Sequence, residues 1–152
     1  MKKIIIGADS AGYTLKEHLK SHLINQGYEV LDMGTDSEES CHYPIFADKV
    51  CKAVTENIND SFGILVCGTG IGMSMCANKH KGIRAALCSD TFSARMTRLH
   101  NDANVLCFGE RVVGYGLACD LVDNFIDAEY EGAQHAKRVE MIIGYENGNF
   151  GV

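Results

Sequence analysis

Five short apolar runs, separated by segments with helical periodicity, recur along almost the whole chain. They are rich in β-branched residues and cover residues 4–6, 29–31, 62–66, 84–88 and 104–107. Strands that are apolar nearly throughout are those with both faces covered, which is typical of parallel sheets. The alternation of such strands with helices therefore predicts an α/β fold, with a parallel sheet between two layers of helices.

A single domain, residues 1–152, is the expected organisation. The chain is 46% hydrophobic and contains one proline, so its 152 residues can build one full core. It shows no internal repeat, no low-complexity segment and no linker. The tail from Asn147 to Val152, with its glycines, is expected to fray.

The charge and hydropathy of the chain exclude two classes of partner. Its formal net charge of -6 argues against nucleic acid or an anionic membrane, because both reward a basic face. The apolar run at the N-terminus is too short for a signal peptide, and no segment approaches the ~20 apolar residues of a membrane span. We therefore expect a cytoplasmic protein that holds any anionic ligand locally.

The cysteines are expected to be free thiols, most of them buried. Seven is an odd number, no Cys-x-x-Cys pair occurs, and most lie in apolar strands or helices. No metal or cofactor is expected either. His18 and His22 have a metal-ligand spacing, but no glutamate completes a His-Glu-x-x-His motif, and surface exposure is the better interpretation. The cysteines are Cys41, Cys51, Cys67, Cys76, Cys88, Cys107 and Cys119.

A glycine-rich turn, residues 67–72, follows the apolar run at 62–66 and opens a helix. It begins with Cys67, so a thiol stands beside a helix start, whose free N–H groups and partial positive charge favour a thiolate and an oxyanion. The alternative is structural: a buried cysteine, with glycines that allow close helix packing. In the helix that follows, Met73, Met75 and Cys76 are expected to be core residues.

Polar residues follow the carboxyl ends of the predicted strands. In parallel α/β sheets these ends share one edge, where ligands gather. The segments placed there are Asp9-Ser10, residues 32–43, residues 67–72, Ser89-Asp90 and residues 109–111.

Motifs along nearly the whole chain resemble those of type B ribose-5-phosphate isomerase, a family that includes galactose-6-phosphate and allose-6-phosphate isomerases. The resemblance implies a three-layer α/β/α sandwich with a five-stranded parallel sheet (Rossmann-like), a homodimer or homotetramer, and an active site shared between two subunits. The motifs are Gly7-Ala8-Asp9, Asp32-x-Gly34-Thr35, Tyr43-Pro44, the turn at 67–72, Ala77-Asn78-Lys79, residues 82–85, residues 100–104, residues 109–114 and Tyr130-x-Gly132.

The resemblance also implies roles for these residues. Cys67 would be the base of an aldose–ketose isomerisation, and a thiolate is suited to taking and returning a proton near neutral pH. His100 would open the sugar ring, a task for a side chain that titrates near neutrality. Backbone N–H groups of Gly68, Gly70 and Gly72 would bind the enediolate oxyanion, Thr69 and Asn101 would position the sugar, and Asp9 would bind a hydroxyl. From the residues alone, Asp9 is a helix N-cap.

The phosphate end departs from the family pattern. The family places a histidine after the first aspartate and arginines late in the chain, and the matching positions here are Ser10, Arg111, Gln134 and Arg138. Two charges are therefore lost, and charge-assisted hydrogen bonds are roughly twice as strong as neutral ones. His135 and Lys137 stand beside Gln134 and are candidates to compensate, although Lys137 is better interpreted as a solvated charge. Tyr43 is expected to line the sugar site.

The expected function is interconversion of ribose 5-phosphate and ribulose 5-phosphate. An alternative is an isomerase, or a subunit of one, for a six-carbon sugar phosphate such as allose 6-phosphate or galactose 6-phosphate. A non-catalytic nucleotide-binding module is a further alternative, because Gly68-x-Gly70 and Asp90 imitate a dinucleotide fingerprint. Its third glycine is misplaced, since Met73 stands where a small residue is needed.

Overall fold

The computed structural model describes residues 2–151, which contain five strands in one sheet with the order β2-β1-β3-β5-β4. Every pair of neighbouring strands is parallel, as predicted. Met1 and Val152, the ends of the predicted domain and of the predicted frayed tail, lie outside the described residues. The strands are β1 (Lys3–Ala8), β2 (Val30–Asp32), β3 (Ser61–Cys67), β4 (Ala85–Leu87) and β5 (Val105–Gly109).

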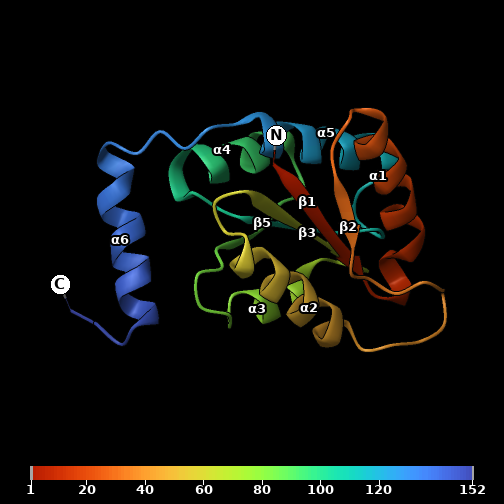
Figure 1. Ribbon diagram of the computed structural model, residues 1–152, viewed down its shortest axis with the longest axis horizontal. Helices are drawn as coiled ribbons and strands as arrows, with labels where there is room; N and C mark the ends of the chain where they lie inside the picture. The colour runs from red at the N-terminus through yellow and green to blue at the C-terminus, as the bar shows by residue number, and fades with distance from the viewer. Residues whose placement is uncertain (1, 152) are drawn as a thin grey trace.

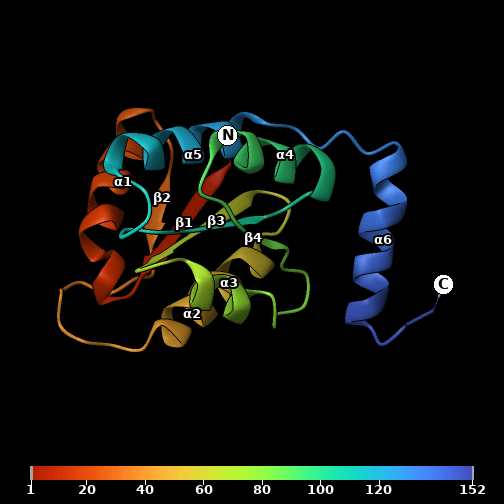
Figure 2. The ribbon, with the colours of Figure 1, turned by 180° about the vertical axis from the view of Figure 1, so that it is seen from behind.

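Helices cover both faces of the sheet, which confirms the three-layer α/β/α sandwich (Figure 1). Helices α1, α4 and α5 lie on one face and α2 and α3 on the other, while α6 stands beside the sandwich in both views (Figures 1 and 2). None of the described helices is long and apolar enough to cross a membrane. The helices are α1 (Tyr13–Asn25), α2 (Tyr43–Glu56), α3 (Ile71–Ala77), α4 (Thr91–Asn101), α5 (Tyr115–Asp127) and α6 (Gln134–Glu146), with a short 3-10 helix η1 at Ser10–Gly12.

The core is divided into two halves by the sheet, because successive side chains of a strand point to opposite faces. In β1, Ile4 and Ile6 pack with α1 and α5, whereas Ile5 packs with α2 and α3. All three side chains are fully buried. The run is apolar without interruption because neither face of β1 meets water.

The prediction for the start of α3 was wrong at Met75. Met73 is fully buried, but Met75 is 66% exposed. Two residues along a helix are about 200° apart around its axis, so a helix that covers one face of a sheet cannot bury both side chains. Cys76 is partly exposed as well.

All seven cysteines are free; Cys41 and Cys76 are partly exposed and the others are buried. Burial raises the pKa of Cys51 to about 12 and that of Cys88 to about 11. Burial also raises the pKa of Cys107 well above its ordinary value. Because the thiolate is the reactive form, these three thiols are inert at neutral pH.

A buried ion-pair network joins α1 to the end of β2. The side chain of Lys16 is fully buried, and its ammonium group contacts the carboxylates of Glu17 and Asp32. Asp32 also accepts hydrogen bonds from Lys20 (2.6 Å) and from the Gly34 N–H (2.9 Å). Burial acts to raise the pKa of Asp32, but these lysines and the Gly34 N–H outweigh it, so the pKa lies below its ordinary value. The network holds the start of the 32–43 loop at the carboxyl edge of the sheet.

Replacing Asp32 by asparagine is expected to lower the free energy of unfolding by about 3 kcal/mol at pH 7, because it leaves the buried Lys16 ammonium without its main partner. A carboxylate with a lowered folded pKa contributes stability above its unfolded pKa and loses it as pH falls through the folded pKa. The wild-type advantage should therefore shrink in acid. Urea unfolding of both proteins from pH 7 to pH 3 measures this.

The matched control for this substitution is Asp48→Asn. Asp48 pairs with Lys52 and His80 at the surface, and its side chain is 41% exposed. Surface pairs of this kind contribute less than about 1 kcal/mol. Equal losses in the two variants would show that the Lys16 network adds nothing beyond a surface pair.

Candidate active site

Cys67 is the last residue of β3, and its side chain is held by the turn that follows. The Gly70 N–H donates a hydrogen bond to the Cys67 Sγ over 3.0 Å. Gly70 has φ +80°, and a Cβ there would come within 2.7 Å of the Phe108 backbone, so only glycine fits. The turn thus holds a thiol that is 5% exposed beside a backbone N–H donor.

Asp9 lies beside this turn because β1 and β3 are neighbours. Its N–H donates to the Val66 carbonyl over 3.3 Å. Its Oδ1 accepts hydrogen bonds from the N–H groups of Ala11 (3.0 Å) and Gly12 (3.2 Å). Asp9 is therefore an N-cap, as predicted from the residues alone, although the helix it caps is η1 and α1 starts only afterwards.

Arg111 and Tyr43 flank the turn from two sides. The Arg111 N–H donates to the Gly68 carbonyl over 3.0 Å, and its guanidinium lies 3.4 Å from the place of a Cβ on Gly68. The Tyr43 ring packs so closely on Gly72 that an added Cβ would meet it at 2.6 Å. The residues gathered at this edge, here called the carboxyl-edge group, are Asp9, Ser10, Tyr43, Cys67, Gly68, Thr69, Gly70, Gly72 and Arg111.

The other predicted site residues lie at the opposite end of the sheet. His100 and Asn101 end α4, where the Asn101 carbonyl accepts a hydrogen bond from Arg84, which precedes β4. The five residues of β5 separate this end from Cys67, which is about 16 Å at roughly 3.3 Å per residue. One chain therefore does not bring Cys67 and His100 together. The residues at this end, here called the amino-edge group, are His100, Asn101, Glu131, Gln134 and His135, and Arg138 follows Gln134 one turn later on α6.

His135 faces His100 and is not free in solvent. The two imidazoles stack with their centroids 4.2 Å apart and their planes 13° apart, and His135 is 8% exposed. The Gln134 amide nitrogen lies 3.5 Å from the His135 Nε2. Lys137 and Arg138 are exposed on α6. The predicted role of His135 in substrate binding stays a prediction.

Glu131 is a member of this group that the sequence did not single out. Its Oε2 lies 3.9 Å from the His100 Nε2 and 3.7 Å from the His135 Nε2. The available signal was its position four residues before His135, inside the Tyr130-x-Gly132 motif. That spacing is informative only if the chain places the segment around Glu131 against α4.

Four of the six histidines, His18, His22, His100 and His135, are poorly arranged for a metal. Ligand atoms of His100, Glu131 and His135 lie within 4.8 Å of one another. However, nearly parallel stacked rings cannot both direct an in-plane lone pair at one ion. His18 packs edge-on against Tyr115, and the His22 Nε2 lies 2.8 Å from the Asp123 Oδ1, so each has its own partner.

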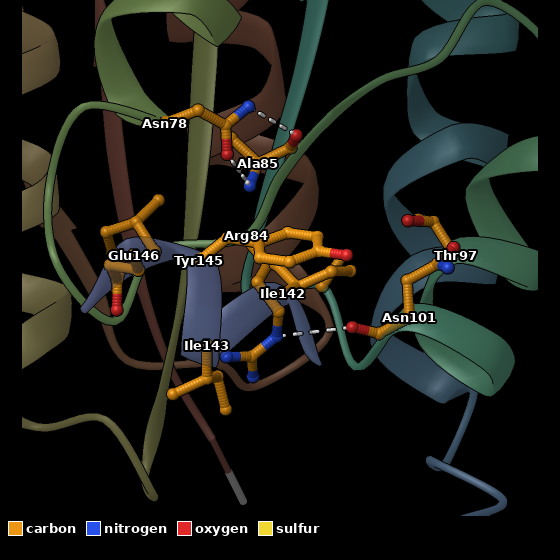
Figure 3. A pocket seen from close by; sticks show the side chains of 11 residues that line it. Asn78, Arg84, Ala85, Thr97, Asn101, Ile142, Ile143, Tyr145 and Glu146 are labelled. Carbon is orange, nitrogen blue, oxygen red and sulfur yellow. Dashed lines mark hydrogen bonds between the residues drawn. The ribbon is translucent and has the colours of Figure 1, made fainter. Parts of the chain in front are cut away.

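A cavity of about 590 Å³ lies between α6, the end of α4 and β4 (Figure 3). The Asn78 side chain bonds the backbone N–H and carbonyl of Ala85, both at 2.9 Å, and Arg84 donates to Asn101. Ile142, Ile143 and Tyr145 of α6 form its apolar wall. Asn101 is the one predicted site residue in its lining, and Cys67 is not among the lining residues.

Comparison with known proteins places this fold and these motifs in one family. The sequence pattern of the Ribose/Galactose Isomerase family matches residues 4–142. The chain is 50% identical over 146 residues to ribose-5-phosphate isomerase B of Escherichia coli (strain K12), covering 96% of this chain and 97% of that protein.

Solved structures of similar proteins support the same family assignment. Ribose-5-phosphate isomerase B of Clostridium thermocellum superposes with a TM-score of 0.93 at 51% identity, over 96% of this chain and 98% of that one. The Mycoplasma genitalium enzyme, solved with bound ribulose-5-phosphate, superposes with a TM-score of 0.92 at 40% identity, over 95% and 96% of the two chains. The chain therefore belongs to the ribose/galactose isomerase family.

Proposed function

We propose that this protein interconverts ribose 5-phosphate and ribulose 5-phosphate through an enediolate. The observation that carries the proposal is the hydrogen bond from the Gly70 N–H to the Cys67 Sγ, at the edge of a sheet where α/β proteins bind ligands. Membership of a family of sugar isomerases supplies the class of reaction. No metal or cofactor takes part, and the free thiols suit a reducing cytoplasm.

Cys67 acts as the base in this proposal. The thiolate takes the proton from C2 of the open aldose, the C2 electrons form a C1–C2 double bond, and the C1 oxygen becomes an oxyanion. The C2 hydroxyl then gives its proton to the C1 oxygen. As the thiol returns its proton to C1, the electrons of the C1–C2 double bond form the new C1–H bond and a carbonyl forms at C2, which gives the ketose. Because the Gly70 N–H is directed at the sulfur, the oxyanion is bound by other N–H groups of the turn, which include those of Gly68 and Gly72.

The site is completed by a second subunit. A catalytic group must come within about 3 Å of the atom that it serves, and the length of the sheet separates Cys67 from His100 in one chain. In a homodimer or homotetramer, His100 of the partner subunit would open the ring over Cys67. Thr69, Asp9 and Tyr43 of the carboxyl-edge group would hold the sugar.

The phosphate contacts come from Arg111 and Arg138, with Ser10 and Gln134 as neutral donors. Introducing histidine at Ser10 and arginine at Gln134 is expected to lower KM for ribose 5-phosphate about tenfold, because charge-assisted bonds add roughly 1.4 kcal/mol in total. Initial rates over a range of substrate concentrations measure this. Lys137→Gln, which removes a nearby exposed charge, should leave KM unchanged. An unchanged KM in the double variant would show that phosphate is bound elsewhere.

The second candidate substrate is a six-carbon sugar phosphate. A longer sugar would differ from ribose 5-phosphate at the phosphate end of the site, where Ser10 and Gln134 are neutral. The deciding experiment compares turnover of ribose 5-phosphate, allose 6-phosphate and galactose 6-phosphate by the purified protein in EDTA. The proposal expects ribose 5-phosphate to be the best substrate and EDTA to have no effect. Preference for a six-carbon sugar would show that this sugar phosphate, and not ribose 5-phosphate, is the substrate. No turnover of any of the three sugars would refute the proposed isomerase activity.

A further inference from the structure

The chain takes an unusual path to bring Glu131 and His135 against the end of α4. Gly132 and Ala133 have φ of +63° and +47°, and Ala133 is a non-glycine residue in a region that few such residues adopt. The Glu131 N–H donates to the Leu99 carbonyl over 3.1 Å, and the His135 N–H donates to the Gly132 carbonyl over 2.8 Å. These bonds fix the turn so that the first residues of α6 face His100.

This turn brings three side chains together into a compact group. The buried His135 ring covers one face of the His100 ring, and the Glu131 carboxylate lies within 4.0 Å of the Nε2 atoms of both rings. The His135 side chain is 11% exposed, whereas the Glu131 side chain is 50% exposed. One ring is therefore held by packing, and the carboxylate remains in contact with solvent.

We propose that Glu131 and His135 are positioning residues for ring opening, acting through His100. This inference rests on the proposed function. His135 sets the plane of the His100 ring by stacking, which restricts the direction in which its N–H points. Glu131 supplies the counter-charge for an imidazolium and is the route by which a proton reaches it from water.

In ring opening, one proton enters the sugar and one proton leaves it. His100 gives its proton to the ring oxygen of the furanose as the bond between that oxygen and C1 breaks. The C1 hydroxyl loses its proton to water, and its electrons form the C1 carbonyl. His100 is left neutral, and one proton from solvent, delivered beside Glu131, restores it. The sugar gains and loses one proton, so its charge is unchanged.

Ring opening can be separated from proton abstraction by the choice of substrate. Ribulose 5-phosphate cannot close to a furanose, because its C5 oxygen carries the phosphate. Exchange of its C1 proton with D2O, followed by NMR, therefore needs Cys67 but not ring opening. Conversion of ribose 5-phosphate, which is mostly cyclic, needs both. The ratio of the two rates reports on ring opening alone.

Glu131→Gln and His135→Asn are expected to lower kcat for ribose 5-phosphate at least about tenfold, within the range of general acid catalysis, with KM little changed. The rate of C1 exchange from ribulose 5-phosphate should stay within about twofold of wild type. His135→Phe keeps a stacking ring and should lose less than His135→Asn. Glu129→Gln, which removes an exposed carboxylate from the same segment, is the matched control and should leave both rates unchanged.

Two results would overturn the inference. Parallel loss of both rates in Glu131→Gln and His135→Asn would show a structural role, since the exchange rate reports whether the Cys67 site is intact. Full retention of both rates would show that neither residue contributes. Failure of the proposed function looks different: the wild-type protein would then show neither conversion nor exchange.

Discussion

Cys67→Ala is expected to lower kcat for ribose 5-phosphate at least about 1000-fold and to abolish C1 exchange from ribulose 5-phosphate. Positioned acid–base groups contribute about 10²–10⁴-fold, and the alanine leaves the turn without any group that can take the C2 proton. Binding should persist, because the N–H groups of the turn and the phosphate contacts remain. Single-turnover rates and equilibrium binding of ribulose 5-phosphate to the variant measure the two effects separately.

The control for the loss of a thiol is Cys119→Ala. Cys119 is a buried residue of α5, on the face of the sheet opposite to α3, and burial raises its pKa. Its replacement should leave kcat within about twofold of wild type, with some loss of stability from the smaller side chain. If Cys67→Ala kept a tenth of the wild-type rate or more, another group would have to be the base.

Mixing two inactive variants, Cys67→Ala and His100→Asn, is expected to restore about a quarter of the wild-type activity. In a shared-site dimer, half of randomly reassociated dimers contain one chain of each kind. In each of these, one site combines an intact Cys67 with an intact His100, and the other site lacks both. Co-refolding the variants in equal amounts and measuring turnover of ribose 5-phosphate tests this.

The matched control mixes His100→Asn with Asn101→Ala. Both changes lie in the amino-edge group, so no pairing of these chains yields a site in which both residues are intact beside the same Cys67. This mixture should recover no activity beyond that of its parents. If the Cys67→Ala and His100→Asn mixture also stayed inactive, although heterodimers were isolated by two different tags, the two residues would have to act within one chain.

The sequence predicted the sheet well because buried parallel strands can be recognised as uninterrupted apolar runs. The run at 62–66 is apolar throughout and became the central β3, whose residues are all buried. The run at 84–88 was predicted too long, and β4 covers only Ala85–Leu87 at the edge of the sheet. An edge strand has one neighbour, so fewer of its residues are paired, and no feature of a short apolar run reveals whether it lies at the edge.

The candidate site likewise has one part that the sequence could predict and one part that it could not. Cys67 and Gly70 are close in the chain, and a glycine-rich turn after a strand limits where their atoms lie, so the thiol and its N–H donor were predictable from local spacing. Glu131 was not predictable. Its contact with His100 depends on two positive φ angles and on the bond to Leu99, neither of which follows from hydrophobic period or motif.

By itself, the sequence determined the α/β architecture, the free thiols and the glycine turn at Cys67, because strand burial and turn conformation depend on residues that are neighbours in the chain. Only the tertiary structure decided that Cys67 and His100 lie at opposite ends of the sheet and that His135 stacks on His100. Both depend on where α4 ends relative to β5 and how the chain turns into α6. Such placements are set by packing between distant segments, and the local hydrophobic periodicity of the sequence does not predict them.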